Sequence, residues 1–332
     1  MLLKYYRSIG PGSILLVILT GVLLWMYQFI SPAQLTAYYS ENAMPLFLFI
    51  DSVLGDNAFA RSVSGFILVL IIAFYLSNFN TRLFFITERT LLPSSVYVIL
   101  SGFFINLQTF NPVLPATLLL IIAIDRVIGS YRKPGIAYNY FDASLLLGLA
   151  SMFYANILWL FPVIIIAILI IRTLYLREIF LSVFGLITPY LVALAIYYIG
   201  GHDLSIIKDR LINNILKGSP AYLWTTADLI AICTGALIII ISLVHLLGRY
   251  NAKKIRTRKI FSLLIWMLVF ALATFFLVPG ASVELFYIVL IPASYLLSHF
   301  LVFVRNKKIA NIVFAIVCIL IVGLQVLRIY NI

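Results

Sequence analysis

Two aspartates and an arginine stand where chemistry at a membrane surface could take place. Asp51 and Asp56 follow the apolar segment 46–50, and Arg61 precedes a long apolar stretch. A carboxylate here could act as a general base or hold a divalent metal ion. A nearby guanidinium could hold a phosphate group. The same spacing also fits a solvated loop, so the residue types alone leave both interpretations open.

Further candidates for substrate contacts lie in the segment 200–226. We expect one imidazole and two cations there to contact an anionic substrate together with Arg61: His202, Arg210 and Lys217. The alternative for His202 is a solvated pair with its neighbour Asp203.

A run of basic residues lies between two apolar stretches near residue 250. Its members are candidate ligands of anionic lipid headgroups: Lys253, Lys254, Arg256, Arg258 and Lys259. The alternative is that these charges only set the orientation of the chain in the membrane.

Other ionisable residues have structural interpretations. Cys233 and Cys318 lie in apolar runs without a second ligand at metal-binding spacing, so no metal site is predicted there. His245 and His299 fall near the ends of apolar runs and are interpreted as interface residues. Asp142 precedes an apolar segment and is predicted to be the N-cap of a helix.

Composition decides the class of protein that positions these residues. The chain has 332 residues, of which 64% are hydrophobic and 10% charged, and its mean hydropathy is +1.13. A soluble domain carries about 25% charged residues. These values indicate a polytopic membrane protein and exclude a soluble enzyme and a nucleic-acid binder. In such a protein the net charge of +12 reports orientation.

The apolar stretches predict about eleven membrane spans, all of them helices because lipid cannot satisfy open backbone groups. The expected spans are Ile14–Ile30, Val63–Leu76, Leu91–Leu107, Val113–Ile128, Ala143–Tyr154, Ile157–Ile171, Ile179–Ile199, Leu229–Leu247, Ile260–Val278, Leu285–Val304 and Ile312–Leu327. The fold class is therefore an all-α bundle forming one integral membrane domain over residues 1–332. The fifth segment is too short to cross as a straight helix, so a broken or tilted element is expected there.

Charge in the loops predicts the orientation. With the N-terminus inside and the C-terminus outside, most of the 23 Lys and Arg residues fall on the cytoplasmic side. Two long outer loops remain, 31–58 and 200–226, and in each we expect an amphipathic surface helix. In the second loop, the apolar residues from Leu204 to Leu216 recur at helical spacing.

One stretch carries a family resemblance. Residues 140–154, YFDASLLLGLASMFY, followed by an apolar span and RTLYLRE, resemble an uncharacterised bacterial family of multi-span inner-membrane proteins. Some members of that family carry a carotenoid-oxygenase label. Such oxygenases hold iron with several histidines, and the three scattered histidines here do not supply that set. The resemblance implies a bacterial inner-membrane location and no established activity.

The order of spans and loops is also similar to that of the C-type membrane glycosyltransferases. These enzymes take a sugar from a polyprenyl phosphate at the outer face, and the resemblance implies a catalytic acid at Asp51, with Asp56 in support. A divalent metal, Mg or Mn, held by these outward carboxylates is the candidate cofactor. The chain departs from that family because it contains no adjacent pair of acidic residues.

Three functions therefore remain in competition. The first is a glycosyltransferase, or an inactive relative of one, that uses a polyprenyl-phosphate-linked sugar at the outer leaflet. The second is a non-enzymatic subunit or assembly factor that packs against other membrane proteins. The third is a transporter or flippase of a lipid-linked substrate, with polar lining residues among Ser101, Asn106, Gln108, Asn156 and Ser294. Membrane lipids are expected partners in all three, and nucleic acid in none.

Overall fold

The structure, a computed structural model, describes residues 2–31, 43–131, 137–171, 176–201, 203–217 and 224–329. Within these ranges the chain forms helices and turns and no strand. The α-helices are α1 (Leu2–Arg7), α2 (Pro11–Ile30), α4 (Pro45–Leu54), α5 (Ala58–Leu83), α6 (Leu92–Ser101), α7 (Val113–Gly129), α8 (Ala137–Ser151), α9 (Phe161–Ile171), α10 (Leu176–Ile199), α11 (Ser205–Leu216), α12 (Thr226–Gly248), α13 (Ile255–Leu277), α14 (Phe286–Phe303) and α15 (Lys307–Ile329). Short 3₁₀ turns are η1 (Ile105–Leu107), η2 (Ala155–Leu160) and η3 (Val283–Leu285).

Among the described residues, seven helical segments are long and apolar enough to cross a membrane. They comprise α2, α5, α10, α12, α13, α15 and the continuous stretch of η3 and α14. Every predicted span overlaps a helix, and the remaining ones fall on the shorter helices α6, α7, α8 and α9. The protein is therefore an all-helical membrane protein, and the number of crossings stays a prediction.

The prediction for Asp142 was wrong. Helix α8 begins at Ala137, so Asp142 lies inside the helix, where its side chain is exposed. An N-cap residue has non-helical backbone angles, whereas a residue in the second turn of a helix has helical ones. The preceding residues Tyr138 and Tyr140 continue the helix, and hydropathy alone did not detect them.

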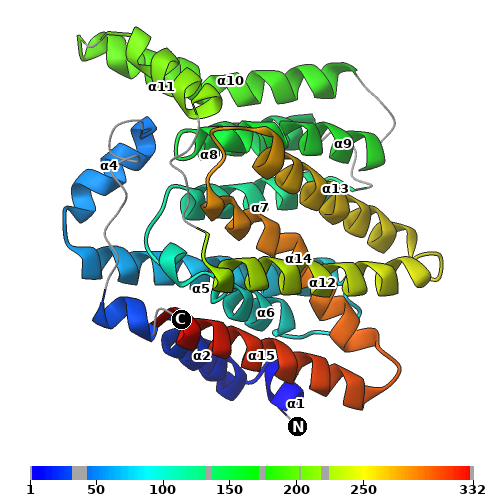
Figure 1. The fold of residues 1–332 in the computed structure, drawn as a ribbon. Helices are drawn as coiled ribbons and strands as arrows, with labels where there is room; N and C mark the ends of the chain where they lie inside the picture. The colour runs from blue at the N-terminus through cyan, green and yellow to red at the C-terminus, as the bar shows by residue number, and fades with distance from the viewer. Residues whose placement is uncertain are drawn as a thin grey trace.

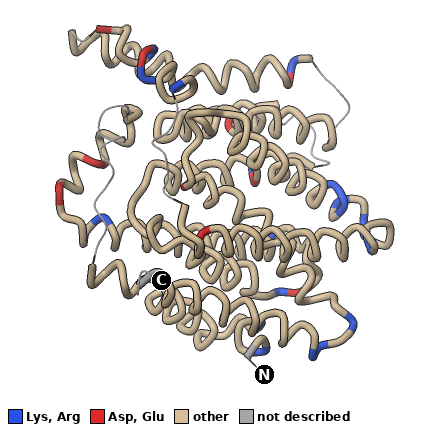
Figure 2. The backbone as a smooth tube through the Cα atoms, viewed as in Figure 1, with Lys and Arg blue, Asp and Glu red and all other residues tan. Residues whose placement is uncertain are grey.

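The long helices run side by side (Figure 1), and the two ends of the bundle differ in charge (Figure 2). Helices α4 and α11 lie at one end, on the left in Figure 1, which we call the α11 end. The turns α12–α13 and α14–α15 lie at the opposite end and carry clusters of Lys and Arg (Figure 2), so we call it the basic end. This separation agrees with the charge pattern expected for one orientation in a membrane.

Helices α8 and α10 make the most extensive helix–helix contact. A β-carbon on Gly185 would lie 2.4 Å from the carbonyl oxygen of Phe141, and one on Gly148 would lie 2.6 Å from that of Leu186. The two backbones approach this closely only because both positions are glycine, as in other tightly packed membrane helices. The Ser151 and Tyr190 hydroxyls, 2.6 Å apart, join the same pair of helices.

Buried polar side chains connect helices that are distant in sequence. The amide of Gln325 on α15 donates to the carbonyl oxygens of Leu24 on α2 and Gly102 after α6, at 3.0 and 3.2 Å. Tyr295 on α14 donates to the carbonyl of Leu76 on α5 at 2.8 Å. In lipid such bonds are worth about 0.6–2 kcal/mol each, so they fix which helices are neighbours.

Candidate functional site

Asp51 and Arg61 form an ion pair between α4 and α5. Arg61 Nη1 lies 2.6 Å from Asp51 Oδ1, and Arg61 Nε donates to the carbonyl of Gly55 at 2.9 Å. Gly55 has φ +61°, a left-handed conformation that lets the chain turn between the two helices. The side chain of Arg61 is 10% exposed, and that of Asp51 is 26% exposed. The pair therefore holds α4 against the start of α5.

The other side of α4 rests on loops from elsewhere in the chain. Phe47 stacks on Phe110 with ring centroids 5.7 Å apart, and the Phe110 N–H donates to the Arg61 carbonyl. At the start of α4, the Leu46 N–H donates to the carbonyl of Met152 at 3.1 Å. These contacts place α4 over the ends of α5 and α8 and over the loop before α7.

Of the described substrate candidates, Arg61 alone pairs with Asp51. Asp56 is exposed in the turn 55–57 and makes no ion pair with any described residue. Lys217 is exposed at the end of α11, and His202 lies outside the described residues. Arg61 is already engaged by Asp51. Only Arg210 of the predicted set joins the buried polar group described next.

Asn156 connects α11 to the body of the protein. Its Nδ2 donates to the carbonyl oxygens of Asn214, at 3.2 Å, and Gly280, at 2.6 Å. A β-carbon on Gly280 would lie 1.8 Å from the Asn214 oxygen, so the loop before η3 touches α11 through its backbone. The Oδ1 of Asn156 is buried and has no partner among the described residues.

Several polar side chains at the α11 end are buried without a partner among the described residues. They include both side-chain polar atoms of Gln108, the hydroxyl of Thr109 and Nη1 of Arg210. We define the polar layer as these three residues with Asn156 and Ser282, whose N–H donates to the hydroxyl of Tyr154 at 3.0 Å. A buried polar group without a partner costs about 1–3 kcal/mol. The polar layer therefore offers unused donors and acceptors to a ligand or to water.

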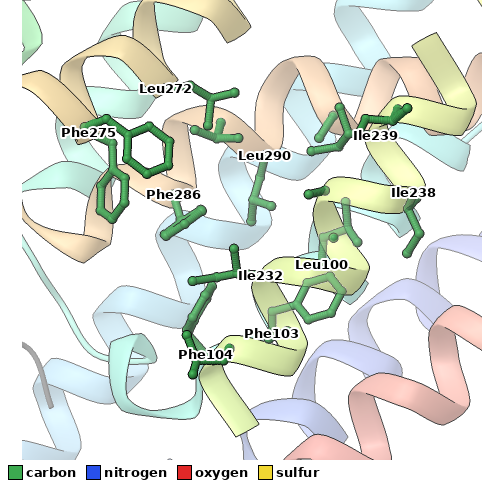
Figure 3. A pocket seen from close by; sticks show the side chains of 18 of the residues that line it. Leu100, Phe103, Phe104, Ile232, Ile238, Ile239, Leu272, Phe275, Phe286 and Leu290 are labelled. Atoms are coloured by element: carbon green, nitrogen blue, oxygen red, sulfur yellow. The ribbon is translucent and has the colours of Figure 1, made fainter. Parts of the chain in front are cut away.

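A cavity of about 440 Å³ lies between α6, α12, α13 and α14 (Figure 3). Its wall carries no charged side chain and is rich in aromatic rings, including Phe103, Phe104, Phe275 and Phe286. Asp51, Arg61 and Arg210 are not among the residues that line it. The cavity suits an apolar chain and offers nothing to a charged headgroup.

The polar layer adjoins the cavity. Phe104 and Phe286, which both line the cavity, stack with ring centroids 5.0 Å apart. The next residue, Tyr287, donates its hydroxyl to the carbonyl of Leu107 at 2.9 Å, and Leu107 precedes Gln108 of the polar layer. Glu284, half-buried in η3, interacts electrostatically with Tyr287. Along the chain, Glu284 thus stands between Ser282 of the polar layer and Phe286 of the cavity wall.

Sequence reasoning missed Glu284 and the cavity. Glu284 stands directly before an apolar span, a position that marks it as an end-of-helix carboxylate. Gln108 and Asn156 were named as candidate lining residues of a transport path, and they do lie in the polar layer. Ser101 and Ser294 from the same set donate to carbonyls of their own helices.

The basic run is divided between two aromatic surfaces. Lys253 Nζ lies 4.7 Å from the Phe303 ring and 5.5 Å from the Phe261 ring, whereas Lys254 is exposed at the N-cap of α13. Burial, followed by the neighbouring Arg249 guanidinium, holds the pKa of Lys253 below its ordinary value.

The rest of the run turns toward another part of the chain. Arg256 and Lys259 lie over the ring of Tyr131, at 5.9 and 5.3 Å. The carbonyl of Arg258 accepts a hydrogen bond from the Tyr250 hydroxyl. Lys253 on the one hand, and Arg256 and Lys259 on the other, therefore contact different aromatic rings.

In the part of the chain that the structure describes, no group of three or more His, Cys, Asp or Glu side chains is placed to hold a metal ion. Residues 43–332 match a family of unknown function (DUF6427), and the chain belongs to this family. No curated protein matches the chain. No solved structure matches it either.

Proposed function

We propose that this DUF6427 member is a glycosyltransferase that uses a polyprenyl-phosphate-linked sugar at the outer face of the bacterial inner membrane. The observation that carries the proposal is the apolar cavity beside the polar layer. An amphiphile matches both parts of this arrangement. Its long apolar chain suits the cavity, and its phosphate head suits the polar layer. The loop charges support an orientation with the α11 end outside.

The cavity suits the isoprenoid chain of such a substrate. Its wall provides aromatic and branched aliphatic side chains from four helices, so that the chain gains dispersion contacts along its length. The wall has no charged group, and a charged headgroup would lose its hydration there without compensation. The head must therefore lie outside the cavity, where the polar layer begins.

The polar layer suits the phosphate and the sugar. Arg210 has a buried Nη1 without a partner among the described residues, and a guanidinium is a good ligand of phosphate oxygens. Gln108 and the Oδ1 of Asn156 offer a donor and two acceptors, which match sugar hydroxyls.

The transfer step requires a base for the acceptor hydroxyl. Glu284 takes the hydroxyl proton while the acceptor oxygen bonds to C1 of the sugar. The bond between C1 and the phosphate oxygen breaks, and the polyprenyl phosphate leaves with the electron pair. Arg210 stabilises the negative charge of this leaving group. Asp51, engaged by Arg61, holds α4 beside the site.

The experiment compares two tryptophan substitutions on α12. Ala236 lines the cavity, and its exposed neighbour Leu237 does not. In lipid nanodiscs, Ala236→Trp should weaken retention of a polyprenyl phosphate about tenfold, and Leu237→Trp should change it less than about twofold. Equal retention in both variants would count against the cavity as the chain site.

Catalysis is tested separately from binding. Glu284→Gln should abolish sugar transfer from a polyprenyl-phosphate donor and leave retention of polyprenyl phosphate unchanged. Normal transfer by this variant would remove Glu284 as the base. Retention without transfer in the unsubstituted protein, across a panel of donor sugars and acceptors, would overturn the assignment as a transferase.

A further inference from the structure

Two histidines face each other near the basic end. His245 on α12 and His299 on α14 have ring centroids 5.7 Å apart. All four ring nitrogens are shielded from solvent and have no hydrogen-bond partner among the described residues. Each imidazole carries at least one N–H, and leaving such a donor buried and unpaired costs about 1–3 kcal/mol. The pair is therefore ready to donate to an acceptor that reaches it.

The surroundings of the pair are aromatic and positively charged. Phe261 and Phe303 lie 5.2 and 4.7 Å from the His299 ring, and the Lys253 ammonium lies over the same two phenylalanine rings. Arg249 and Lys253 are also the charged groups that act on both histidines. This positive field disfavours a metal cation and favours an acceptor that carries negative charge.

Two acidic side chains near this end are already engaged. Glu88 pairs with Arg7, and Asp125 pairs with Arg82 at 2.6 Å. The cations beside the histidines are therefore not neutralised by these carboxylates.

Two turns join to form one basic surface. Arg249 donates from Nη1 to the carbonyl of Phe303 at 2.6 Å, which brings the α12–α13 turn against the end of α14. The α14–α15 turn follows directly and exposes Arg305, Lys307 and Lys308. Figure 2 shows Lys and Arg at both of these turns, at the same end of the bundle.

This surface continues into the lipid-facing side of α12. Val244 is 64% exposed and Leu247 is 54% exposed, on either side of the half-buried His245. Apolar exposure at the end of a membrane helix is contact with lipid chains, and the lipid headgroups lie at the depth of the adjacent turn.

We propose that the seam between α12 and α14 at the basic end binds the phosphate headgroup of an anionic phospholipid. Arg249 and Lys253 supply the positive charge, and His245 donates an N–H to a phosphate oxygen. His299 lies behind His245 and positions its ring. The site is independent of the cavity and the polar layer at the α11 end. It also differs from a diffuse basic surface, because Lys253 and His245 contribute and the exposed Lys254 does not.

The test compares adjacent lysines that carry the same charge. The purified protein is placed in nanodiscs of phosphatidylcholine with a minor fraction of phosphatidylglycerol. The phosphatidylglycerol that stays bound after detergent extraction is counted by native mass spectrometry. Lys253→Gln should lower retention of phosphatidylglycerol about fivefold, and Lys254→Gln should change it less than twofold. Equal losses of phosphatidylglycerol in the two variants would show that non-specific charge attraction holds the lipid, which would overturn the proposal.

A second pair separates hydrogen bonding from charge. His245→Phe should lower retention about as much as Lys253→Gln, whereas His245→Gln, which keeps an N–H donor, should restore most of it. If His245→Phe does not fold, the two lysine variants still decide the outcome. Equal retention of phosphatidylglycerol and phosphatidylcholine by the unsubstituted protein would also overturn the proposal.

Discussion

Gly280 and Asn214 touch through their backbones: a β-carbon on Gly280 would lie 1.8 Å from the Asn214 carbonyl oxygen. Asn156 completes the contact by donating to the carbonyls of both residues. Helix α11, which carries Arg210, is thus positioned over the polar layer by one glycine and one amide.

Gly280→Ala should displace α11. No rotamer can relieve the clash, because the Asn214 carbonyl oxygen is a backbone atom of another segment, so we expect a loss of about 1–3 kcal/mol. That loss lowers the melting temperature by several degrees. Gly323→Ala on α15 is the matched control, because a β-carbon there meets no atom within 4 Å. A melting curve for Gly280→Ala that matches the control would contradict the close approach.

The ion pair of Asp51 and Arg61 should stabilise α4 and not take part in chemistry. Asp51→Asn leaves the Arg61 guanidinium with a weaker partner and should cost about 1–2 kcal/mol of stability. Asp56→Asn, at an exposed position five residues on, should change stability by less than about 0.5 kcal/mol. Melting temperatures in one detergent compare the two. If Asp51→Asn lost sugar transfer but kept the stability of the unsubstituted protein, Asp51 would have a catalytic role and the prediction would be wrong.

Gly185→Ala should loosen α10 from α8. The new β-carbon would lie 2.4 Å from the Phe141 carbonyl oxygen, so the helices must separate, with a loss of about 1–3 kcal/mol. Gly12→Ala on α2 meets no atom within 4 Å and serves as the control. Cysteine crosslinking between α8 and α10, together with melting temperature, reports the separation. Crosslinking at the unsubstituted rate would show that the backbones do not meet this closely.

Asp142→Ala tests the start of α8. An N-cap aspartate replaced by alanine costs about 1 kcal/mol. At an exposed position inside the helix, alanine has the higher helix propensity and should be neutral or slightly stabilising. A clear fall in melting temperature would indicate that the helix begins at Ala143.

Much of the fold could be predicted because the membrane restricts the choices. Lipid demands satisfied backbone groups, so each long apolar stretch had to be a helix, and the apolar spacing in 204–216 indicated α11. The start of α8 could not be predicted, because Tyr138, Asn139 and Tyr140 carry no apolar signal before the first apolar run. Hydropathy indicates which environment a helix contacts, but it does not identify the residue at which the helix begins.

The candidate site was less predictable because it depends on contacts between distant segments. Arg61 followed Asp51 closely enough to suggest a shared site, but the pair neutralises itself in the structure. Gly280 stands in a Pro-Gly turn, and nothing in the sequence around it indicated that α11 would pack against it. The cavity arises from the spacing of four helices, and that spacing cannot be derived from residue types.

The bonds of Gln325 have a consequence for the order of assembly. Gln325 and Leu24 are 301 positions apart, and they join α15 to α2. A ribosome makes α2 long before it makes α15. During translation α2 must therefore remain beside the insertion machinery, or leave it and return, until α15 emerges. The packing of these two helices is completed only when synthesis has passed Gln325.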